Sequence, residues 1–131
     1  MAQDTYFNLK TNLLSSNIHI KNQGNVHYNV SVADVVEVVE IVEKEIVMKI
    51  TRNLNFNPSE DMLLNVTYIA TLQTKYNITR EEFETDLKQG LGILNNVFSR
   101  IALTIGELTS QSILGPILTI PGYNMKEIIV K

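Results

Sequence analysis

Histidine has the chemistry best suited to acid–base catalysis and metal binding, because its imidazole titrates near neutral pH. The 131-residue sequence holds two, His19 and His27, each inside a segment that reads as a β-strand. Neither has a carboxylate or a second histidine at the spacing typical of metal ligands. We therefore expect a structural or surface role for both histidines and predict no metal site.

Two other features have both a chemical and a structural interpretation. Ser99 lacks the G-x-S-x-G setting of a nucleophilic serine. Gly90-Leu91-Gly92 does not follow a strand as a phosphate loop would, so its glycines are expected to allow close approach of a helix to its neighbours. No set of acid, base and nucleophile can be assembled from this sequence, and we expect neither an enzyme nor a cofactor.

Acidic residues recur every three positions in residues 34–43, DVVEVVEIVE. In a helix Glu37, Glu40 and Glu43 would lie roughly along one side, whereas the valine and isoleucine content favours a strand. We predict extended or irregular structure. The carboxylates could dock a partner, but a solvated edge is the preferred interpretation.

Composition excludes several classes of protein. The chain is 44% hydrophobic and 19% charged, which fits one globular domain spanning 1–131. Its net charge of −3 gives no basic footprint for nucleic acid, and its lack of cysteine excludes disulfides and thiolate metal sites. With no signal-peptide pattern and no apolar run long enough for a membrane span, we expect a cytoplasmic protein.

The strongest periodic pattern lies in residues 79–109 and predicts one long helix. Apolar residues spaced alternately by four and three form a stripe over roughly six turns. The members of this stripe are Leu87, Leu91, Leu94, Phe98, Ile101, Ile105 and Leu108. Thr79 and Glu82 form a capping-box pattern at the start, and Gly115-Pro116 stops the helix.

A second apolar set widens the surface of this helix beyond one stripe. Its members are Ile93, Val97, Ala102 and Leu103. A helix that is apolar on more than one side must be covered on more than one side. We expect the chain's own sheet to cover one side and a second copy the other. The whole interpretation of the sequence, including the function hypothesis given below, depends on an unbroken rod from Leu87 to Leu108 that is apolar on both sides.

Alternating apolar and polar residues predict the strands that precede the helix. The segment from Phe7 to Ile20 breaks near residues 13–16 and indicates two pieces joined by a bulge. Residues 26–32, 46–56 and 64–72 alternate cleanly, with turns at 21–25 and 57–61, and only Arg52 interrupts the apolar set of its strand. The prediction is an α+β fold: a four-stranded antiparallel sheet, then one long helix packed on it.

An apolar tail follows the helix. Residues 117–123 are expected to be extended and to end at a Pro-Gly turn, and residues 125–131 are either a final strand or a frayed end.

With these segments in place, the chain resembles the SecB family of bacterial protein-export chaperones over nearly its whole length. The phrases that carry the resemblance are FNLKTNLLSSNIHIK (7–21), EIVMKITRNLNF (45–56), MLLNVTYIATLQTKYNI (62–78) and the helix-and-tail segment 95–124. Each phrase is only apolar periodicity, and their order and spacing are what identify the family.

The resemblance implies a homotetramer, a dimer of dimers, whose apolar grooves hold unfolded polypeptides. By resemblance the groove is formed by Tyr28, Leu64, Val66 and Tyr68, although Leu64 and Val66 are equally well interpreted as core beneath the helix. The expected oligomer interface consists of Leu91, Leu94, Phe98, Ile101 and Ile105.

The sequence also departs from the export chaperones. Acidic residues that dock the export motor SecA are replaced by Asn17, Lys21 and Asn65, so docking to SecA is doubtful. Some relatives instead protect the antitoxin of a toxin–antitoxin system, and an antitoxin is a possible partner. The function hypothesis is a chaperone for unfolded polypeptides, in protein export or beside an antitoxin. The alternative is an oligomeric scaffold or phage-encoded structural protein that reuses the fold.

Overall fold

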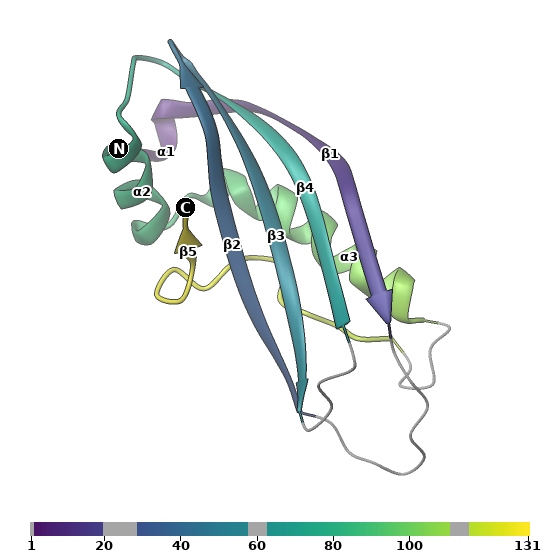
Figure 1. The fold of residues 1–131 in the computed structure, drawn as a ribbon. Coiled ribbons are helices and arrows are strands. Elements are labelled where there is room, and N and C mark those ends of the chain that lie inside the picture. Colours follow the sequence, from purple (N-terminus) through teal and green to yellow (C-terminus); the bar gives the residue numbers. More distant parts are fainter. Residues whose placement is uncertain (1, 20–28, 58–62, 111–115) are drawn as a thin grey trace, which may run out of the picture.

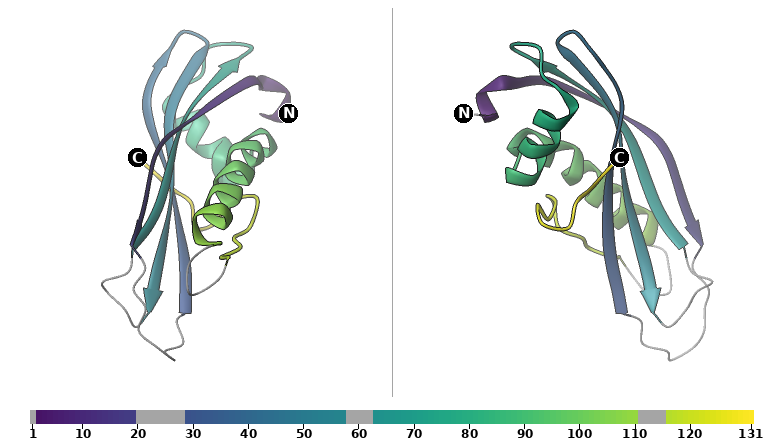
Figure 2. Two further views of the ribbon diagram at one scale, coloured as in Figure 1. Left: turned by 90° about the vertical axis from the view of Figure 1, so that its right-hand side faces the viewer. Right: turned by 60° about the vertical axis from the view of Figure 1, so that its left-hand side comes forward.

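Four long strands form a curved sheet, and the helices lie on one side of it (Figures 1 and 2). The computed structural model describes residues 2–19, 29–57, 63–110 and 116–131. The elements in chain order are α1 (Ala2–Thr5), β1 (Tyr6–His19), β2 (Asn29–Val42), β3 (Glu45–Asn57), β4 (Leu63–Thr74), α2 (Arg80–Gln89), the 3-10 turn η1 (Gly92–Leu94), α3 (Asn95–Thr109) and β5 (Ile129–Val130).

The strand order in the sheet is β1-β4-β3-β2-β5. The four long strands pair antiparallel, as predicted, but β5 joins β2 in parallel, so the sheet is mixed and has five strands. The expected four-stranded antiparallel sheet is therefore wrong at this edge. The sequence did not decide the point because β5 is two residues long, too short to show periodicity.

The alternation in β3 and β4 is confirmed by burial. Every second residue of each strand points under the helices and is buried, and the intervening residues face the other side of the sheet. The apolar members of this inner face are Ile46, Met48, Ile50, Leu54, Phe56, Leu64, Val66, Tyr68, Ala70 and Leu72. The outer face is largely polar, with the hydroxyls of Thr51 and Thr67 2.8 Å apart across the two strands.

Two segments whose sequence pattern is irregular, Phe7 to Ile20 and residues 34–43, contribute to strands β1 and β2. The register of β1 against β4 shifts between Leu13 and Ser15, which confirms the predicted bulge, and shifts again between Phe7 and Lys10. Residues 34–42 belong to β2, so the β-branched residues outweigh the three-residue recurrence of glutamate. The predicted turns lie largely outside the described residues.

The helical region differs most from the prediction. Thr79 caps α2 with the expected capping box, in which the Glu82 N–H donates to the Thr79 hydroxyl and the Glu82 carboxylate accepts from the Thr79 N–H. However, α2 ends at Gly90, whose φ of 107° favours glycine, and η1 and α3 follow. The unbroken rod from Leu87 to Leu108 is therefore wrong.

The break leaves the apolar stripe on the core side. The apolar stripe residues of α2, η1 and α3 belong to the buried core, with Leu108 partly buried against it. Leu87, Leu91, Leu94, Phe98, Ile101 and Ile105 are each at most 1% exposed. Cover by the chain's own sheet is thus confirmed, and the second side of α3 is considered below. None of the described helices is long and apolar enough to cross a membrane.

Candidate functional site

An apolar groove runs between the outer side of α3 and the tail that follows it. Its volume is about 730 Å³, and its apolar walls come from Ala102, Leu103, Gly106, Pro116, Leu118 and Pro121. Leu103 is 67% exposed on the helix and Leu118 is 85% exposed on the tail. Large apolar side chains exposed together on both walls of a hollow mark a place where apolar groups of a partner can be buried.

The groove has little chemistry besides this apolar character. Ser99, Ser110 and Thr119 contribute hydroxyls, and Glu107 is the ionisable residue among its lining residues. Such a surface can gain energy by removing apolar groups from water but offers few polar groups to select one sequence. It is therefore suited to binding apolar segments with low specificity.

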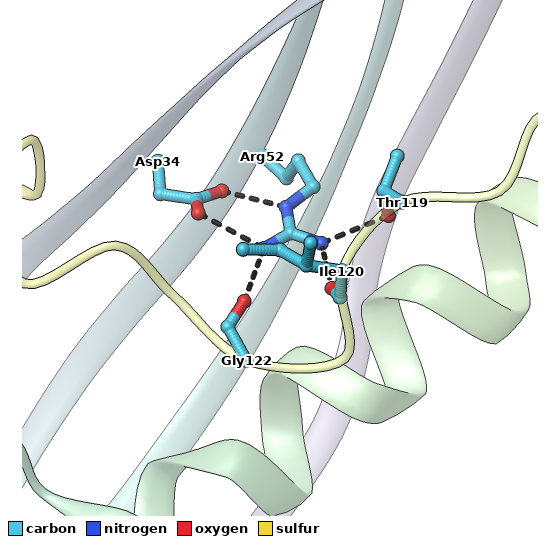
Figure 3. Close-up of polar contacts among 5 residues, drawn as sticks. All are labelled: Asp34, Arg52, Thr119, Ile120 and Gly122. Carbon is cyan, nitrogen blue, oxygen red and sulfur yellow. Dashed lines mark hydrogen bonds and ion pairs between the residues drawn. The ribbon is translucent and has the colours of Figure 1, made fainter.

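The tail wall is held by a buried arginine (Figure 3). Arg52 on β3 is completely buried and forms a bidentate ion pair with Asp34 on β2, with distances of 2.7 and 2.9 Å. The same guanidinium donates to the Thr119 hydroxyl at 2.9 Å and to the carbonyl oxygens of Ile120 at 2.7 Å and Gly122 at 2.6 Å. A segment with no regular secondary structure is thereby fixed to the sheet.

Other contacts fix the tail on either side of this arginine. The Thr109 hydroxyl at the end of α3 accepts from the Ile117 N–H at 2.7 Å, and Ser99 donates to the Pro121 carbonyl at 2.9 Å. Ser99, the weak candidate nucleophile, thus has a structural contact. After the turn, β5 and the adjoining Lys131 pair with β2 and return the chain to the sheet.

Tyr123 connects the tail to the break between α2 and η1. Its hydroxyl donates to the Leu87 carbonyl at 2.6 Å and accepts from the Leu91 N–H at 2.8 Å. The Leu87 carbonyl also accepts from the Gly90 N–H at 3.2 Å, so the phenol adds a second bond to this carbonyl and satisfies the Leu91 N–H just beyond the helix. Burial raises the pKa of Tyr123 above its ordinary value, and the hydrogen bond from Leu91 opposes this shift.

The predicted groove residues lie elsewhere. Leu64, Val66 and Tyr68 are on the inner face of β4, buried beneath α3, and the Tyr68 hydroxyl lies 2.8 Å from that of Thr104 on the helix. They line the core of this chain and not the open groove. Tyr28 lies outside the described residues.

The predicted oligomer-interface residues are also covered in this chain. The residues in question are buried within the single chain: Leu91, Leu94, Phe98, Ile101 and Ile105. A subunit contact at these positions stays a prediction that a single chain does not test. The apolar surface of α3 still available to another molecule is the opposite side, at Ala102, Leu103 and Gly106.

Sequence reasoning missed the tail as part of the site. Leu118 and Ile120 are exposed because Arg52 binds the backbone next to them, and a contact between residues so far apart in sequence leaves no periodic pattern. The one available signal was Arg52 itself, a charge in an otherwise apolar row, since a buried arginine requires partners. An acidic residue of the same inward parity, Asp34, stood in the segment interpreted as ambiguous.

The histidines add no metal chemistry in the described residues. His19 is exposed on β1, and His27 lies outside the described residues. Within the described ranges, no group of three or more histidine, aspartate or glutamate side chains is placed to hold a metal ion.

A mixed sheet with a long C-terminal helix on one face, and a fixed tail beside that helix, defines an α+β protein. No family model and no curated protein matches the chain. Among solved structures, it is similar to the SecB-like chaperone of Mycobacterium tuberculosis in complex with a ChAD peptide from the HigA1 antitoxin. The two chains are 12% identical, with a TM-score of 0.65 over 93% of this chain and 91% of that one.

A second similar structure is a protein of unknown function from Streptococcus agalactiae. It is 12% identical, with a TM-score of 0.43 over 86% of this chain and 96% of that one. The M. tuberculosis structure, with its TM-score of 0.65, shows that the fold of the present chain is SecB-like, which confirms the resemblance seen in the sequence at the level of the fold.

Proposed function

We propose that this protein is a SecB-like chaperone that binds non-native polypeptide reversibly in the groove between α3 and the tail, without catalysis. The observation that carries the proposal is the pair of exposed leucines, Leu103 and Leu118, on opposite walls of a groove whose tail wall is fixed. Unfolded chains expose apolar side chains, and a groove with few polar groups accepts many sequences. The solved structure with the same fold contains a bound peptide, which supports this occupant.

The expected energetics fit a protein that holds and releases its client. Burying each leucine contributes about 1.5–3 kcal/mol, and part of this gain is offset by ordering the bound segment. Binding through a few such contacts is weak enough to be reversible. The proposed partner is an unfolded or nascent polypeptide, and the proposed location is the cytoplasm.

An antitoxin is favoured over the export pathway as the source of the client. The similar M. tuberculosis chaperone is bound to an antitoxin peptide. On the outer face of the present sheet, Asn17 on β1 donates to the side-chain oxygen of Asn65 on β4 at 3.0 Å. Two of the positions at which the resemblance implies SecA-binding carboxylates are therefore occupied by amides that bond to each other. We propose that this protein acts without SecA.

The test is suppression of aggregation of a chemically unfolded client at a stoichiometric ratio. We expect the wild-type protein to slow aggregation, and we expect Leu103→Ser with Leu118→Ser to weaken client binding by at least about tenfold. Leu14→Ser is the matched control, because Leu14 is a 51% exposed leucine next to Thr51 and Thr67 on the other face of the sheet. A wild-type protein that leaves aggregation unchanged contradicts the proposal.

A second candidate is an oligomeric scaffold, or a phage-encoded structural protein, that reuses the fold with its groove closed. The burial of Leu64, Val66 and Tyr68 beneath α3 favours it, because these predicted groove residues are closed off in this chain. An apolar fluorescent dye separates the candidates. If the groove is open, the native protein should bind the dye, and the Leu103→Ser variant should show much weaker dye fluorescence. A closed scaffold should not bind the dye.

A further inference from the structure

A buried ion pair lies in the middle of an otherwise apolar sheet face. Arg52 and Asp34 are direct partners across β2 and β3, and both side chains point under the helices with Ile50, Leu54 and Val36 around them. Taking two charges out of water is costly, and a buried pair is often no more stable than apolar residues of similar size. Core packing therefore does not explain why an arginine occupies this position.

The partners of Arg52 suggest what it does. Its guanidinium makes five hydrogen bonds, of which two go to Asp34 and three to the tail at Thr119, Ile120 and Gly122. Asp34 holds one edge of the guanidinium fork and thereby turns the other edge toward the tail. The carboxylate thus orients the arginine, and the arginine orients the tail.

Two of the three tail acceptors are backbone carbonyls, which decides where the neighbouring side chains point. Because the arginine binds the main chain of Ile120 and Gly122, the Ile120 side chain is left 55% exposed, next to Leu118 at 85%. Fixing an exposed apolar segment in this way removes the entropy that it would otherwise lose on binding a partner. The tail wall of the groove is thus preorganised.

An aromatic pair supports the same guanidinium from the helix side. The guanidinium carbon lies 5.4 Å from the centroid of the Phe98 ring on α3, and the Tyr123 ring lies 5.1 Å from Phe98. Stacking on an aromatic ring holds a guanidinium in place and adds a favourable cation–π interaction. The sheet, α3 and the tail therefore meet at one residue.

We propose that Arg52, oriented by Asp34, is a positioning residue for polypeptide binding: it fixes residues 119–122 beside α3 so that Leu118 and Pro121 form one wall of the groove. The effect on polypeptide binding rests on the proposed function, but the fixing of the tail by Arg52 can be measured without any client.

The decisive variant replaces both charges with apolar residues, Asp34→Val with Arg52→Leu. Removing the pair together avoids an unpaired buried carboxylate, so we expect the variant to fold with a similar denaturation midpoint. Hydrogen exchange of the tail amides in residues 116–124 should accelerate by at least about tenfold, while amides of β3 and β4 keep their protection. Binding of an unfolded client should weaken, through loss of a fixed wall and not through loss of the fold.

Two further variants sharpen the result. Thr119→Val removes one bond to Arg52 and leaves the ion pair in place, so tail exchange should rise less than in the double variant. Thr51→Val with Thr67→Val removes a hydroxyl pair on the opposite sheet face and should change neither tail exchange nor client binding.

The outcomes distinguish this inference from the proposed function. Unchanged tail exchange in the double variant, or exchange that rises equally in tail and strands, overturns the positioning role. Faster tail exchange with unchanged client binding also overturns it, although the groove proposal then still stands on Leu103. Failure of the wild-type protein to bind client contradicts the proposed function, while the exchange result still reports on the fixing of the tail.

Discussion

At the scale of single residues, the fold uses tyrosine hydroxyl groups to join segments that are distant in sequence. Tyr123 satisfies the end of α2, and Tyr6 at the start of β1 donates to a carboxylate oxygen of Asp86 on α2 at 2.5 Å. The Tyr6 ring also packs against Phe83, with centroids 5.9 Å apart. Each phenol has an apolar ring for the core and a polar tip for a helix, a combination that Phe lacks.

The Tyr6 contact predicts a loss of stability in alkali. Burial, followed by the hydrogen bond to Asp86, raises the pKa of Tyr6 above its ordinary value of 10.0. The unfolded chain releases this proton at lower pH than the folded chain does, so stability is fully present below about pH 10 and falls as the pH rises further. The slope for one such group is about 1.4 kcal/mol per pH unit.

This effect can be measured by denaturant unfolding of the wild-type protein and of Tyr6→Phe. The measurements should run from about pH 8 to about pH 11, on either side of the ordinary tyrosine pKa of about 10. We expect the variant to be less stable at pH 8, because Asp86 loses a donor, and to show a shallower decline above pH 10. Parallel curves for the two proteins would show that Tyr6 does not carry the alkaline transition.

At the scale of elements, glycines with opposite roles explain why the helical region departs from the prediction. Gly90 ends α2 with φ of 107°, and its N–H bonds to the carbonyls of Asp86 and Leu87. Gly106 lies inside α3, where a Cβ would be 3.9 Å from its nearest neighbours, the Ile117 carbonyl oxygen and a Leu118 methyl. Both glycines lie within residues 79–109, where apolar residues recur at helical spacing. This spacing does not show which glycine ends a helix and which lies inside one.

Alanine at these two positions should therefore have opposite effects on stability. Gly90→Ala forces a side chain into positive φ and places its Cβ 2.7 Å from the sulfur of Met125, so we expect destabilisation by about 1–3 kcal/mol. Gly106→Ala adds a Cβ at ordinary contact distance and should stabilise the protein by about 0.5–1 kcal/mol. Thermal unfolding of the two variants beside wild type measures both effects, and equal shifts of the same sign would contradict the assigned helix break.

The elements that could be predicted are those specified locally. Alternation identified β3 and β4, the irregularity near Leu13 identified a bulge, and the Thr79–Glu82 pair identified the start of α2. The break at Gly90 depends on Tyr123, the fixed tail depends on Arg52, and β5 depends on two residues of β2. Each of these features rests on contacts between distant parts of the sequence, so periodicity within one segment could not reveal it.

At the scale of the whole molecule, the sheet has one polar face and one face covered by α3 and the tail. The outer sheet face carries threonine, asparagine and lysine side chains such as Thr51, Asn65 and Lys49. On the other side, α3 and the tail lie next to each other against the sheet, because Arg52 of β3 donates directly to the tail carbonyls of Ile120 and Gly122 (Figure 3). The exposed apolar groove lies between α3 and the tail, and this arrangement bears on the oligomer expected from the sequence. A second copy covering α3 would bury Leu103, the same side chain that we assign to the client.

Subunit contact and client binding should therefore compete if both use this surface. We expect the wild-type protein to exceed the 14.8 kDa mass of one chain in light scattering or sedimentation, and we expect Leu103→Ser to lower the average mass. Leu14→Ser, on the other face of the sheet, should leave it unchanged. Excess unfolded client should lower the number of protein chains per complex. A wild-type protein that is monomeric at all concentrations would show that no sister subunit covers α3, and the groove would then be free for polypeptide alone.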